Sequence, residues 1–364
     1  MNRPRRLGRA PGRPEVLLVT PAASPTSTNG SVVFARHLAR HGRGVRYRLL
    51  GSAGQQLVDS SAMIEPIFGR GPRGDWRDQL RVFRRLLRPD RCAIHHYIFA
   101  PHPKAIRAIR AARLINRTPA IQTLPSMPPD SEPLEPLLFG ERIVTLTEAS
   151  ALRLRSSGVE HVEVIRPCVP RPASTPTMSA ARRRLQLSVP ELSLGEEPAF
   201  LYAGDIETSD GAMTFVEAAA EVREAIPEAR FILACRAKRV DHAHPRLKVQ
   251  AHILSLGLKD HVTLLGHVDD MPALQASMTA MTLSVDTLHA KVETPLVVLE
   301  AMAQGVPVIV SDLPTLRELS GLGQGVAVVA RSAPEALASK LIEMAQTPSI
   351  RARMSRGAIK TVED

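Results

Sequence analysis

Short apolar runs alternate with segments of helical periodicity along most of the chain. The apolar run at 15–21 is followed by a polar loop and then by residues 32–41, in which apolar side chains recur every three or four positions. Gly42 and Gly44 end that pattern before a second apolar run at 45–50. Strands that alternate with helices in this way predict βαβ units and a parallel sheet.

The same alternation continues along the chain, apart from one interruption. Residues 170–197 are rich in Pro, Ser and Thr around a single basic amphipathic stretch, which predicts a connection between two domains. A length of 364 residues also favours two domains. We therefore expect a basic flexible leader, an N-terminal Rossmann-like domain, a linker, a C-terminal Rossmann-like domain and a C-terminal helical segment, at residues 1–14, 15–169, 170–197, 198–345 and 346–364. Further strands are expected at 92–96, 120–123, 142–146, 162–165, 199–204, 230–235, 262–265, 280–285 and 306–310.

Composition places the chain among ordinary globular proteins. Hydrophobic residues make up 44% and charged residues 23% of the sequence, which argues against extensive disorder. The formal net charge is +11, mostly from an excess of arginine, and this favours polyanionic partners. Aromatic residues are only 3%, which leaves few stacking platforms for a nucleic acid. We expect no nucleic-acid partner and favour peripheral contact with an anionic membrane; solvated surface charge is the alternative.

Cysteine usage and the N-terminus bear on the cellular compartment. The three cysteines lie far apart and outside any C-x-x-C spacing, so neither a disulfide framework nor a zinc site is predicted. The basic N-terminus is not followed by the apolar stretch of a signal peptide, and no uncharged run approaches the ~18 residues of a membrane span. We expect a cytoplasmic protein, with the inner face of the membrane as the place of any peripheral contact.

The most informative segment is KVETPLVVLEAMAQGVPVIVS at 291–311, whose pattern predicts a loop, a helix, a glycine turn and a strand. Pro295 suits a first helical turn, and the amides of Leu296 and Val297 would face the loop, where the helix dipole favours a phosphate. Glu300 lies one turn deeper and could accept hydrogen bonds from ribose hydroxyls. The structural alternative is that the carboxylates of this segment only complement the dipole or lie at the surface.

The sequence LEAMAQGVPVIVSD, which begins at Leu299, resembles the signature of the retaining family 4 glycosyltransferases. The resemblance continues, in order and spacing, at 200–204, 227–233 and 256–266. It is looser in the N-terminal half, at 16–21, 29–30, 90–95 and 164–170. It implies the GT-B fold, in which two Rossmann-like doubly wound domains with parallel sheets face each other across a cleft. The N-terminal domain would take the acceptor and the C-terminal domain the nucleotide-sugar donor.

The resemblance also implies roles for individual residues. It places the donor ribose at Glu300 and the transferred sugar near Glu293. The main chain of Gly266 to Val268 would border the nucleobase. Gly30 would let the first loop approach the donor phosphates or the acceptor, and a plain turn residue is the alternative.

Two pairs of residues depart from the family's pattern around the donor diphosphate. Relatives usually carry Gly-Arg after the first strand of this domain and Lys-Gly several residues later. This chain has Gly204-Asp205 and Asp210-Gly211 in those places. The two glycines keep their expected positions beside the diphosphate, but two carboxylates repel a diphosphate rather than bind it.

Other cations are therefore expected to compensate for the missing ones. Lys291 lies next in sequence to the phosphate-facing helix start, and Arg236 and Lys238 follow the strand at 230–235. Each could supply a charge-assisted hydrogen bond to a phosphate oxygen. If none does, the donor differs from that of the relatives.

Two further positions depart from the pattern. The family's first glutamate position is taken by Val292, so Glu293 lies one residue late. A histidine that often follows the fourth strand is absent, and His95, His96 or His102 could replace it. We assign His95 as the catalytic candidate, and a histidine satisfied in the core or in a loop is the alternative for each of the three.

These observations predict a retaining glycosyltransferase of the hexosyl class. It would move a sugar from a nucleoside diphosphate to a glycan, lipid-linked or small-molecule acceptor, with neither cofactor nor metal. The departing phosphate would help to deprotonate the acceptor, so the protein would mainly position groups and stabilise charge. The rival interpretation is a non-catalytic homologue that binds a glycan or a partner enzyme. An epimerase or phosphorylase of the same fold is a third.

Overall fold

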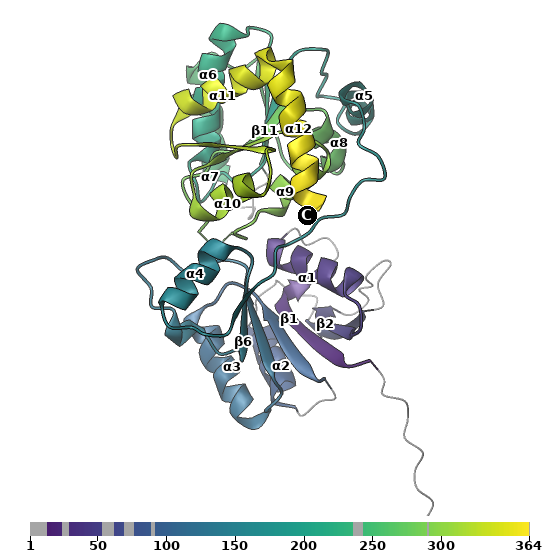
Figure 1. The fold of residues 1–364 in the computed structure, drawn as a ribbon, viewed down its shortest axis with the longest axis vertical. Helices are drawn as coiled ribbons and strands as arrows, with labels where there is room; N and C mark the ends of the chain where they lie inside the picture. The colour runs from purple at the N-terminus through teal and green to yellow at the C-terminus, as the bar shows by residue number, and fades with distance from the viewer. Residues whose placement is uncertain are drawn as a thin grey trace, which may run out of the picture. The chain divides into compact units, whose positions relative to one another are not determined.

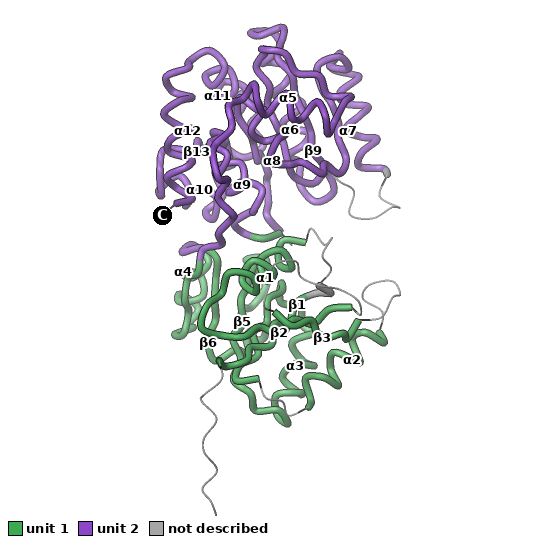
Figure 2. The backbone as a smooth tube through the Cα atoms, turned by 90° about the vertical axis from the view of Figure 1, so that its right-hand side faces the viewer, with its two compact units in different colours: residues 1–146, 150–165, 290–292 green, residues 147–149, 166–289, 293–364 purple. Residues whose placement is uncertain are grey.

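The computed structural model describes residues 13–23, 29–52, 62–68, 76–88, 92–235, 243–289 and 291–363. The chain divides into two compact units, shown in Figure 2. Unit 1 comprises residues 1–146, 150–165 and 290–292, and unit 2 comprises residues 147–149, 166–289 and 293–364. Within the described part of the chain, no helix combines the length and apolar character that crossing a membrane requires.

Unit 1 is built on a seven-stranded sheet in which every pairing is parallel, in the order β3-β2-β1-β4-β5-β6-β7. Its strands are β1 (Glu15–Ala23), β2 (Arg46–Ser52), β3 (Met63–Phe68), β4 (Ile94–Ile98), β5 (Ala120–Leu124), β6 (Arg142–Thr145) and β7 (Val162–Val164). The helices of this part of the chain are α1 (Gly30–His41), α2 (Trp76–Leu87), α3 (Pro103–Ile115), the short η1 (Glu135–Leu137) and α4 (Glu148–Ser156).

Side chains of β1, the strand labelled in Figure 1, alternate between the two faces of its sheet. Leu17 and Val19 pack with side chains of α2 and α3, whereas Val16 and Leu18 pack with side chains of α1. Because successive residues of a strand point to opposite faces, a strand covered on both faces is apolar at every position. This explains why residues 16–19 of β1 form one unbroken apolar run.

Unit 2 repeats this architecture with six parallel strands in the order β10-β9-β8-β11-β12-β13. Its strands are β8 (Ala199–Tyr202), β9 (Arg230–Ala234), β10 (Val262–Leu265), β11 (Ala280–Leu283), β12 (Val308–Ser311) and β13 (Val326–Val329). Its helices are α5 (Met178–Ser188), α6 (Gly211–Ala225), α7 (Ala243–Ser255), α8 (Met271–Ala276), α9 (Leu296–Ala303), α10 (Pro314–Leu322), α11 (Pro334–Gln346) and α12 (Pro348–Glu363). The prediction of two Rossmann-like domains with parallel sheets is confirmed.

The segment 170–197, expected from sequence to be a linker, groups with unit 2. It contains α5, whose residue Arg182 is buried and donates to the carbonyl oxygens of Ser277 at 3.1 Å and Glu197 at 2.9 Å. A buried guanidinium needs such acceptors, so this basic stretch is tied to unit 2.

The apolar pattern did not reveal two strands, and both lie at edges of their sheets. β3 contains Pro66, a residue that sheets tolerate at an edge because it cannot donate to a neighbouring strand. β13 has only four residues and directly follows Gly325. Glu65 and Pro66 interrupt the apolar pattern of β3, whereas β13 is an apolar run of only four residues.

Candidate functional site

The strand order of unit 2 reverses between β8 and β11, its first and fourth strands. In open parallel sheets, ligands bind outside the carboxyl ends of the strands at such a reversal. The loop that follows β8 ends at Asp210. The carbonyl oxygen of Gly211, the first residue of α6, accepts a hydrogen bond at 3.2 Å from the hydroxyl of Ser284, which directly follows β11. The loop that contains Asp205 and Asp210, the two departures from the family's pattern, therefore lies where the strand order reverses.

The side chain of Tyr202 leaves no room for a side chain at Gly204 or Gly211. The Tyr202 hydroxyl donates to the Asp205 carbonyl oxygen at 3.0 Å. A Cβ atom added at Gly204 would lie 2.6 Å from the phenol oxygen, and one added at Gly211 would lie 2.7 Å from it and 2.9 Å from the Ser284 carbonyl oxygen. Burial raises the pKa of Tyr202, so the phenol stays protonated and donates. Both glycines are needed for packing, whether or not a ligand binds.

The Asp205 carboxylate is engaged by its own loop. Asp205 is buried, and its Oδ1 accepts from the amides of Glu207 at 3.1 Å and Thr208 at 3.0 Å. The Thr208 hydroxyl donates to the same carboxylate, at 2.9 Å to Oδ2. Such local bonds are characteristic of aspartate in turns, so Asp205 shapes the loop.

Asp210 precedes α6 without capping it through its side chain. Its Oδ2 accepts from the Ser332 hydroxyl at 2.6 Å, and its amide donates to Asp286 Oδ1 at 3.0 Å. Burial, and then the neighbouring Asp286 carboxyl, raise the pKa of Asp210. Sequence reasoning missed both partners. Asp286 directly follows the strand expected at 280–285. It could have been found from the rule that ligand sites lie at the carboxyl ends of parallel strands, whereas nothing in the sequence indicates Ser332.

The segment from Pro295 to Glu300 contains the start of helix α9. The sequence placed Pro295 in the first helical turn; in the structure it is the N-cap residue, and α9 begins at Leu296. No side chain caps this helix start, so the amides of Leu296 and Val297 are its first two donors. The predicted glycine turn is present, since Gly305 has a φ of 74°.

Glu300 is partly buried on the second turn of α9. Across the described ranges, no residue forms a hydrogen bond or ion pair with its carboxylate, and burial alone raises the pKa of Glu300. Buried carboxylates are normally paired or hydrogen-bonded. A carboxylate without such a partner, one turn beyond an uncapped helix start, is the feature expected of a ligand site.

Lys291 and Val292 group with unit 1, together with Gly30 at the start of α1. A Cβ atom on Gly30 would lie 2.4 Å from Val292 Cγ2, so a glycine is required here by the packing of Val292. Burial lowers the pKa of Lys291 to about 8, which leaves its ammonium charged at neutral pH. The start of α1 is thus packed against Val292, the residue at the family's first glutamate position.

Glu293 is buried at the start of the next segment of unit 2. The hydroxyl of Thr147, which also groups with unit 2, donates to Glu293 Oε2 at 3.2 Å. The carboxylate is therefore held by the protein and not turned out to solvent. Its expected position near the transferred sugar stays a prediction.

The histidines of β4 are enclosed in unit 1. His95 is the second residue of the strand, is buried, and lies edge-on to Tyr97. His96 shares a 2.7 Å hydrogen bond with the Thr123 hydroxyl, and burial lowers its pKa to about 4. Ligands bind at the carboxyl ends of parallel strands, whereas His95 lies near the amino end. The geometry favours the packing role that the sequence left open for it.

The remaining predicted site residues separate into two groups. Gly266 is exposed with open space around it, and the side chain of Val268 is buried, so only their main chain could border a base. Arg236 and Lys238 lie outside the described residues. Their expected contact with the donor stays a prediction.

The comparisons with known proteins agree with this architecture. A sequence model of the family described as "Glycosyl transferases group 1" matches residues 197–347. No curated protein matches the chain.

Solved structures match nearly the whole chain at low identity. HepE from Anabaena in complex with UDP-glucose is 16% identical with a TM-score of 0.74, and the match covers 96% of this chain and 94% of that one. Sucrose-phosphate synthase from Thermosynechococcus elongatus is 16% identical with a TM-score of 0.78 and the same coverage. A glycosyltransferase from Rickettsia africae is 14% identical with a TM-score of 0.70, over 97% of this chain and 94% of that one. The chain has the GT-B fold, and the match of unit 2 to glycosyl transferases group 1 supports a glycosyltransferase.

Proposed function

We propose that this protein is a retaining glycosyltransferase that moves a hexose-type sugar from a nucleoside diphosphate to a glycan, lipid-linked or small-molecule acceptor. The observation that carries the proposal is Glu300, a partly buried carboxylate with no partner among the described residues. It lies within the stretch that matches glycosyl transferases group 1. A ribose diol would supply the two hydroxyl donors that this carboxylate lacks.

The start of α9 suits the phosphate end of such a donor. Its amides at Leu296 and Val297 are not capped by a side chain, and the helix dipole adds partial positive charge there. HepE has been crystallised with UDP and with UDP-glucose, so a uridine nucleotide is the first donor to test here. A diphosphate at the helix start and a ribose at Glu300 would be bound one helical turn apart.

Lys291 is the cation that we assign to the diphosphate, since Asp205 and Asp210 stand where relatives have basic residues. It precedes Pro295 by four residues, and its pKa is lowered to about 8 by burial. The ammonium is therefore charged below that pH and loses its charge above it. Nucleotide affinity should fall as the pH rises through about 8, and Lys291→Met should remove both the binding and this pH dependence.

The transfer itself is proposed to rely on positioning and charge stabilisation. The departing phosphate would take the acceptor proton, with Glu293 beside the transferred sugar and no metal or cofactor required. Product analysis by NMR would show an anomeric configuration equal to that of the donor. Unchanged turnover in the presence of a chelator would agree with metal-independent transfer, and loss of turnover would contradict it.

The test begins with binding. Thermal unfolding and calorimetry would be measured with a panel of nucleoside diphosphates and their sugars, for the wild type and for Glu300→Gln. Loss of one charged hydrogen-bond acceptor should weaken binding by about 10- to 100-fold, which corresponds to ~1.5–3 kcal/mol. The matched control is Glu217→Gln on α6, a carboxylate at 3.3 Å from His252, which should bind as the wild type does. Equal affinity of Glu300→Gln and wild type would exclude the ribose assignment.

The rival function is a non-catalytic GT-B homologue that binds a glycan or a partner enzyme. It is favoured by one observation, the two aspartates at the positions that relatives use for the diphosphate. Under this function no nucleotide would shift the unfolding temperature, whereas a glycan array would give specific binding. Nucleotide binding that depends on Glu300 would exclude it.

A further inference from the structure

Two helices of unit 1 and the residues just after them form one of the strongly basic parts of the chain. Residues 76–88 and 103–117 contain ten arginine and lysine residues and a single acidic residue, Asp78, whereas the whole chain has a formal net charge of +11. Such clustering differs from the solvated, scattered charge of an ordinary surface. The α2 and α3 segments are therefore a concentrated source of positive charge in unit 1.

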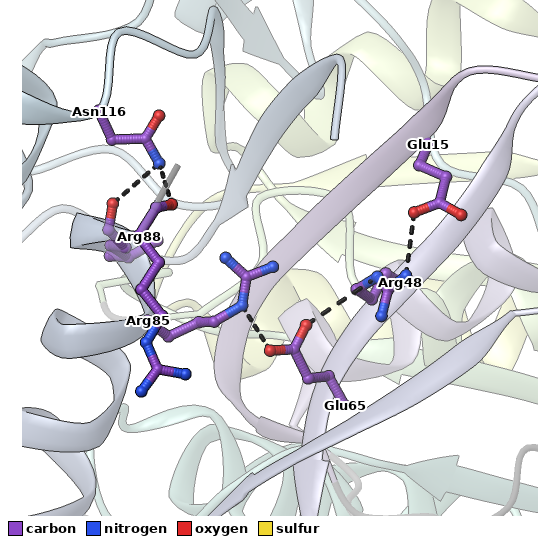
Figure 3. A network of polar contacts seen from close by, with 7 residues as sticks. Glu15, Arg48, Glu65, Arg85, Arg88 and Asn116 are labelled. Carbon is purple, nitrogen blue, oxygen red and sulfur yellow. Dashed lines mark hydrogen bonds and ion pairs between the residues drawn. The ribbon is translucent and has the colours of Figure 1, made fainter. Parts of the chain in front are cut away.

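Both helices cover the same face of the sheet and lie side by side in Figures 1 and 2. Leu86 of α2 and Ile109 of α3 belong to one core cluster. The Asn116 side chain, after α3, donates to the carbonyl oxygens of Leu86 at 3.0 Å and Arg88 at 2.9 Å (Figure 3). The two helices thus pack side by side in one layer of unit 1 and meet at their C-terminal ends.

The outward side of α2 combines apolar and basic side chains. Trp76, Leu80 and Arg84 follow one another at four-residue spacing and form one stripe of the helix. Trp76 is 65% exposed and Leu80 is 38% exposed. The Arg77 guanidinium lies 5.5 Å from the centre of the Trp76 ring. A large aromatic ring beside arginines, at a surface, is typical of groups that lie at a membrane interface.

The C-terminal end of α3 carries two more exposed apolar side chains, next to the C-terminal end of α2. Leu114 is 81% exposed and Ile115 is 66% exposed, and they directly precede Asn116, which joins α3 to the end of α2. Exposed Arg107 and Arg110 lie on the same helix. Single exposed apolar residues are common in soluble proteins, but several of them among clustered cations indicate an interaction surface.

A cavity on the flank of α2 adds sites for phosphate. It has a volume of about 240 Å³ and is lined by Pro66 and Ile67 of β3 and by Arg81, Arg84, Arg85 and Arg88. Figure 3 shows Arg85 directed at Glu65, which also faces Arg48. Arg81 pairs with Asp78 at 2.8 Å. Arg84 and Arg88 both line this cavity, and within the described ranges no carboxylate pairs with either of them.

We propose that this surface, the α2–α3 face, docks unit 1 on an anionic lipid bilayer. It consists of Trp76, Leu80, Leu114 and Ile115 with Arg77, Arg81, Arg84 and Arg88. The arginines contact lipid phosphates, for which a guanidinium is a well-matched donor, and the four apolar side chains enter the boundary between headgroups and acyl chains.

Two physical features favour a bilayer over a soluble polyanion. A nucleic acid or an anionic polysaccharide would neutralise the arginines and leave the exposed apolar side chains in water. A bilayer satisfies both kinds of side chain at once. This inference does not depend on the proposed transfer reaction, since none of the surface residues belongs to the donor site.

The chain supplies its own reporter, because Trp76 is its only tryptophan. The full chain would be titrated with phosphatidylcholine vesicles and with vesicles that also contain phosphatidylglycerol. With the anionic vesicles we expect a blue shift of the tryptophan emission and quenching by brominated acyl chains. Added salt should weaken the binding, since screening shortens the range of the attraction. Neutral vesicles should cause neither change.

Charge reversal tests the surface itself. Arg84→Glu combined with Arg88→Glu should weaken binding to anionic vesicles by about tenfold or more, because each cation near an anionic surface contributes measurably. The matched control is Arg353→Glu with Arg356→Glu on α12 of unit 2, which changes the net charge by the same amount at exposed positions and should bind nearly as the wild type. Leu114→Ser with Ile115→Ser should reduce the binding that persists at high salt.

Three outcomes would overturn the proposal. The first is vesicle binding without a change in Trp76 emission, which would assign the binding to another basic part of the chain. The second is an equal loss in both charge-reversed proteins, which would indicate net charge alone. The third is tight binding to heparin or DNA with none to anionic vesicles, which would identify a soluble polyanion as the partner. Nucleotide-induced shifts, measured without lipid, should be identical in all these variants.

Discussion

Asp205 and Glu300 are two carboxylates of unit 2 with opposite surroundings. In the loop 204–211, Asp205 is surrounded by donors of its own loop, and Asp210 accepts from a serine hydroxyl. In the segment 293–303, Glu300 is partly buried and has no partner among the described residues. The Asp205 carboxylate therefore stabilises its own loop, whereas the lack of a partner at Glu300 supports the proposal that Glu300 binds a ligand.

This comparison changes how the departures from the family's pattern are understood. From sequence, Asp205 and Asp210 are two negative charges opposed to a diphosphate. In the structure the Asp205 charge is satisfied by two amides and a hydroxyl, and the raised pKa of Asp210 favours its neutral form more than usual. The opposition to a diphosphate is therefore weaker than the formal charges suggest.

Removal of the Asp205 carboxylate should have the largest effect on stability. Asp205→Ala leaves buried amide and hydroxyl donors without an acceptor and should lower the free energy of unfolding by about 2–4 kcal/mol. Chemical denaturation would measure it. Asp312→Ala is the control, since Asp312 only pairs with Arg317 at 2.5 Å on the surface and should change stability by less than about 1 kcal/mol. Similar small losses for both would show that Asp205 is not needed by the loop.

Gly211→Ala should have the next largest effect and lower the free energy of unfolding by about 1–3 kcal/mol. The added Cβ atom would lie 2.7 Å from the Tyr202 hydroxyl oxygen and 2.9 Å from a backbone oxygen of Ser284, so the loop has to move. Gly266→Ala is the matched control, because no atom lies within 4 Å of its added Cβ atom. Thermal unfolding of the two variants would separate a packing requirement from a general effect of glycine replacement.

Glu300→Gln should raise stability at neutral pH by about 1 kcal/mol, although it weakens nucleotide binding. Burial raises the folded-state pKa of Glu300 above its unfolded value. Wild-type stability therefore falls as the pH rises through the interval between these two values, and it is unaffected below it. The glutamine variant lacks this loss, so the two unfolding curves should converge toward about pH 4. A variant less stable than the wild type at neutral pH would reveal a partner of this carboxylate.

Asp210→Asn should have the smallest effect, a gain of a few tenths of a kcal/mol at neutral pH, because solvent screens the pair. Folding favours the protonated form of Asp210, whose pKa is raised, so the wild type loses stability as the pH rises through the folded-state value. Asparagine keeps an acceptor for Ser332 and removes the charge beside Asp286. Denaturation at two pH values would measure this gain, and a loss at neutral pH would show that the charge is required.

The sequence by itself determined the fold class and the position of the segment around Glu300. Apolar runs covered on both faces, such as β1, and the helical pattern that follows it are local signals. The apolar pattern of β3 is interrupted by Glu65 and Pro66, so β3 was not predicted. The segment from Pro295 to Gly305 is also local, and only the first residue of its helix differed from the prediction.

Only the tertiary structure decided which charged side chains have a hydrogen-bond partner. The partners of Asp210 are Asp286 and Ser332, which lie 76 and 122 positions further along the chain. One acceptor of Arg182, the Ser277 carbonyl oxygen, lies 95 positions further along the chain. The clustering of arginines on the α2–α3 face likewise depends on two helices that lie side by side. The spacing of residues in the sequence shows only the periodicity within one helix or strand. The pairing and burial of a charge depend on which elements meet, and this is decided by packing of the whole domain.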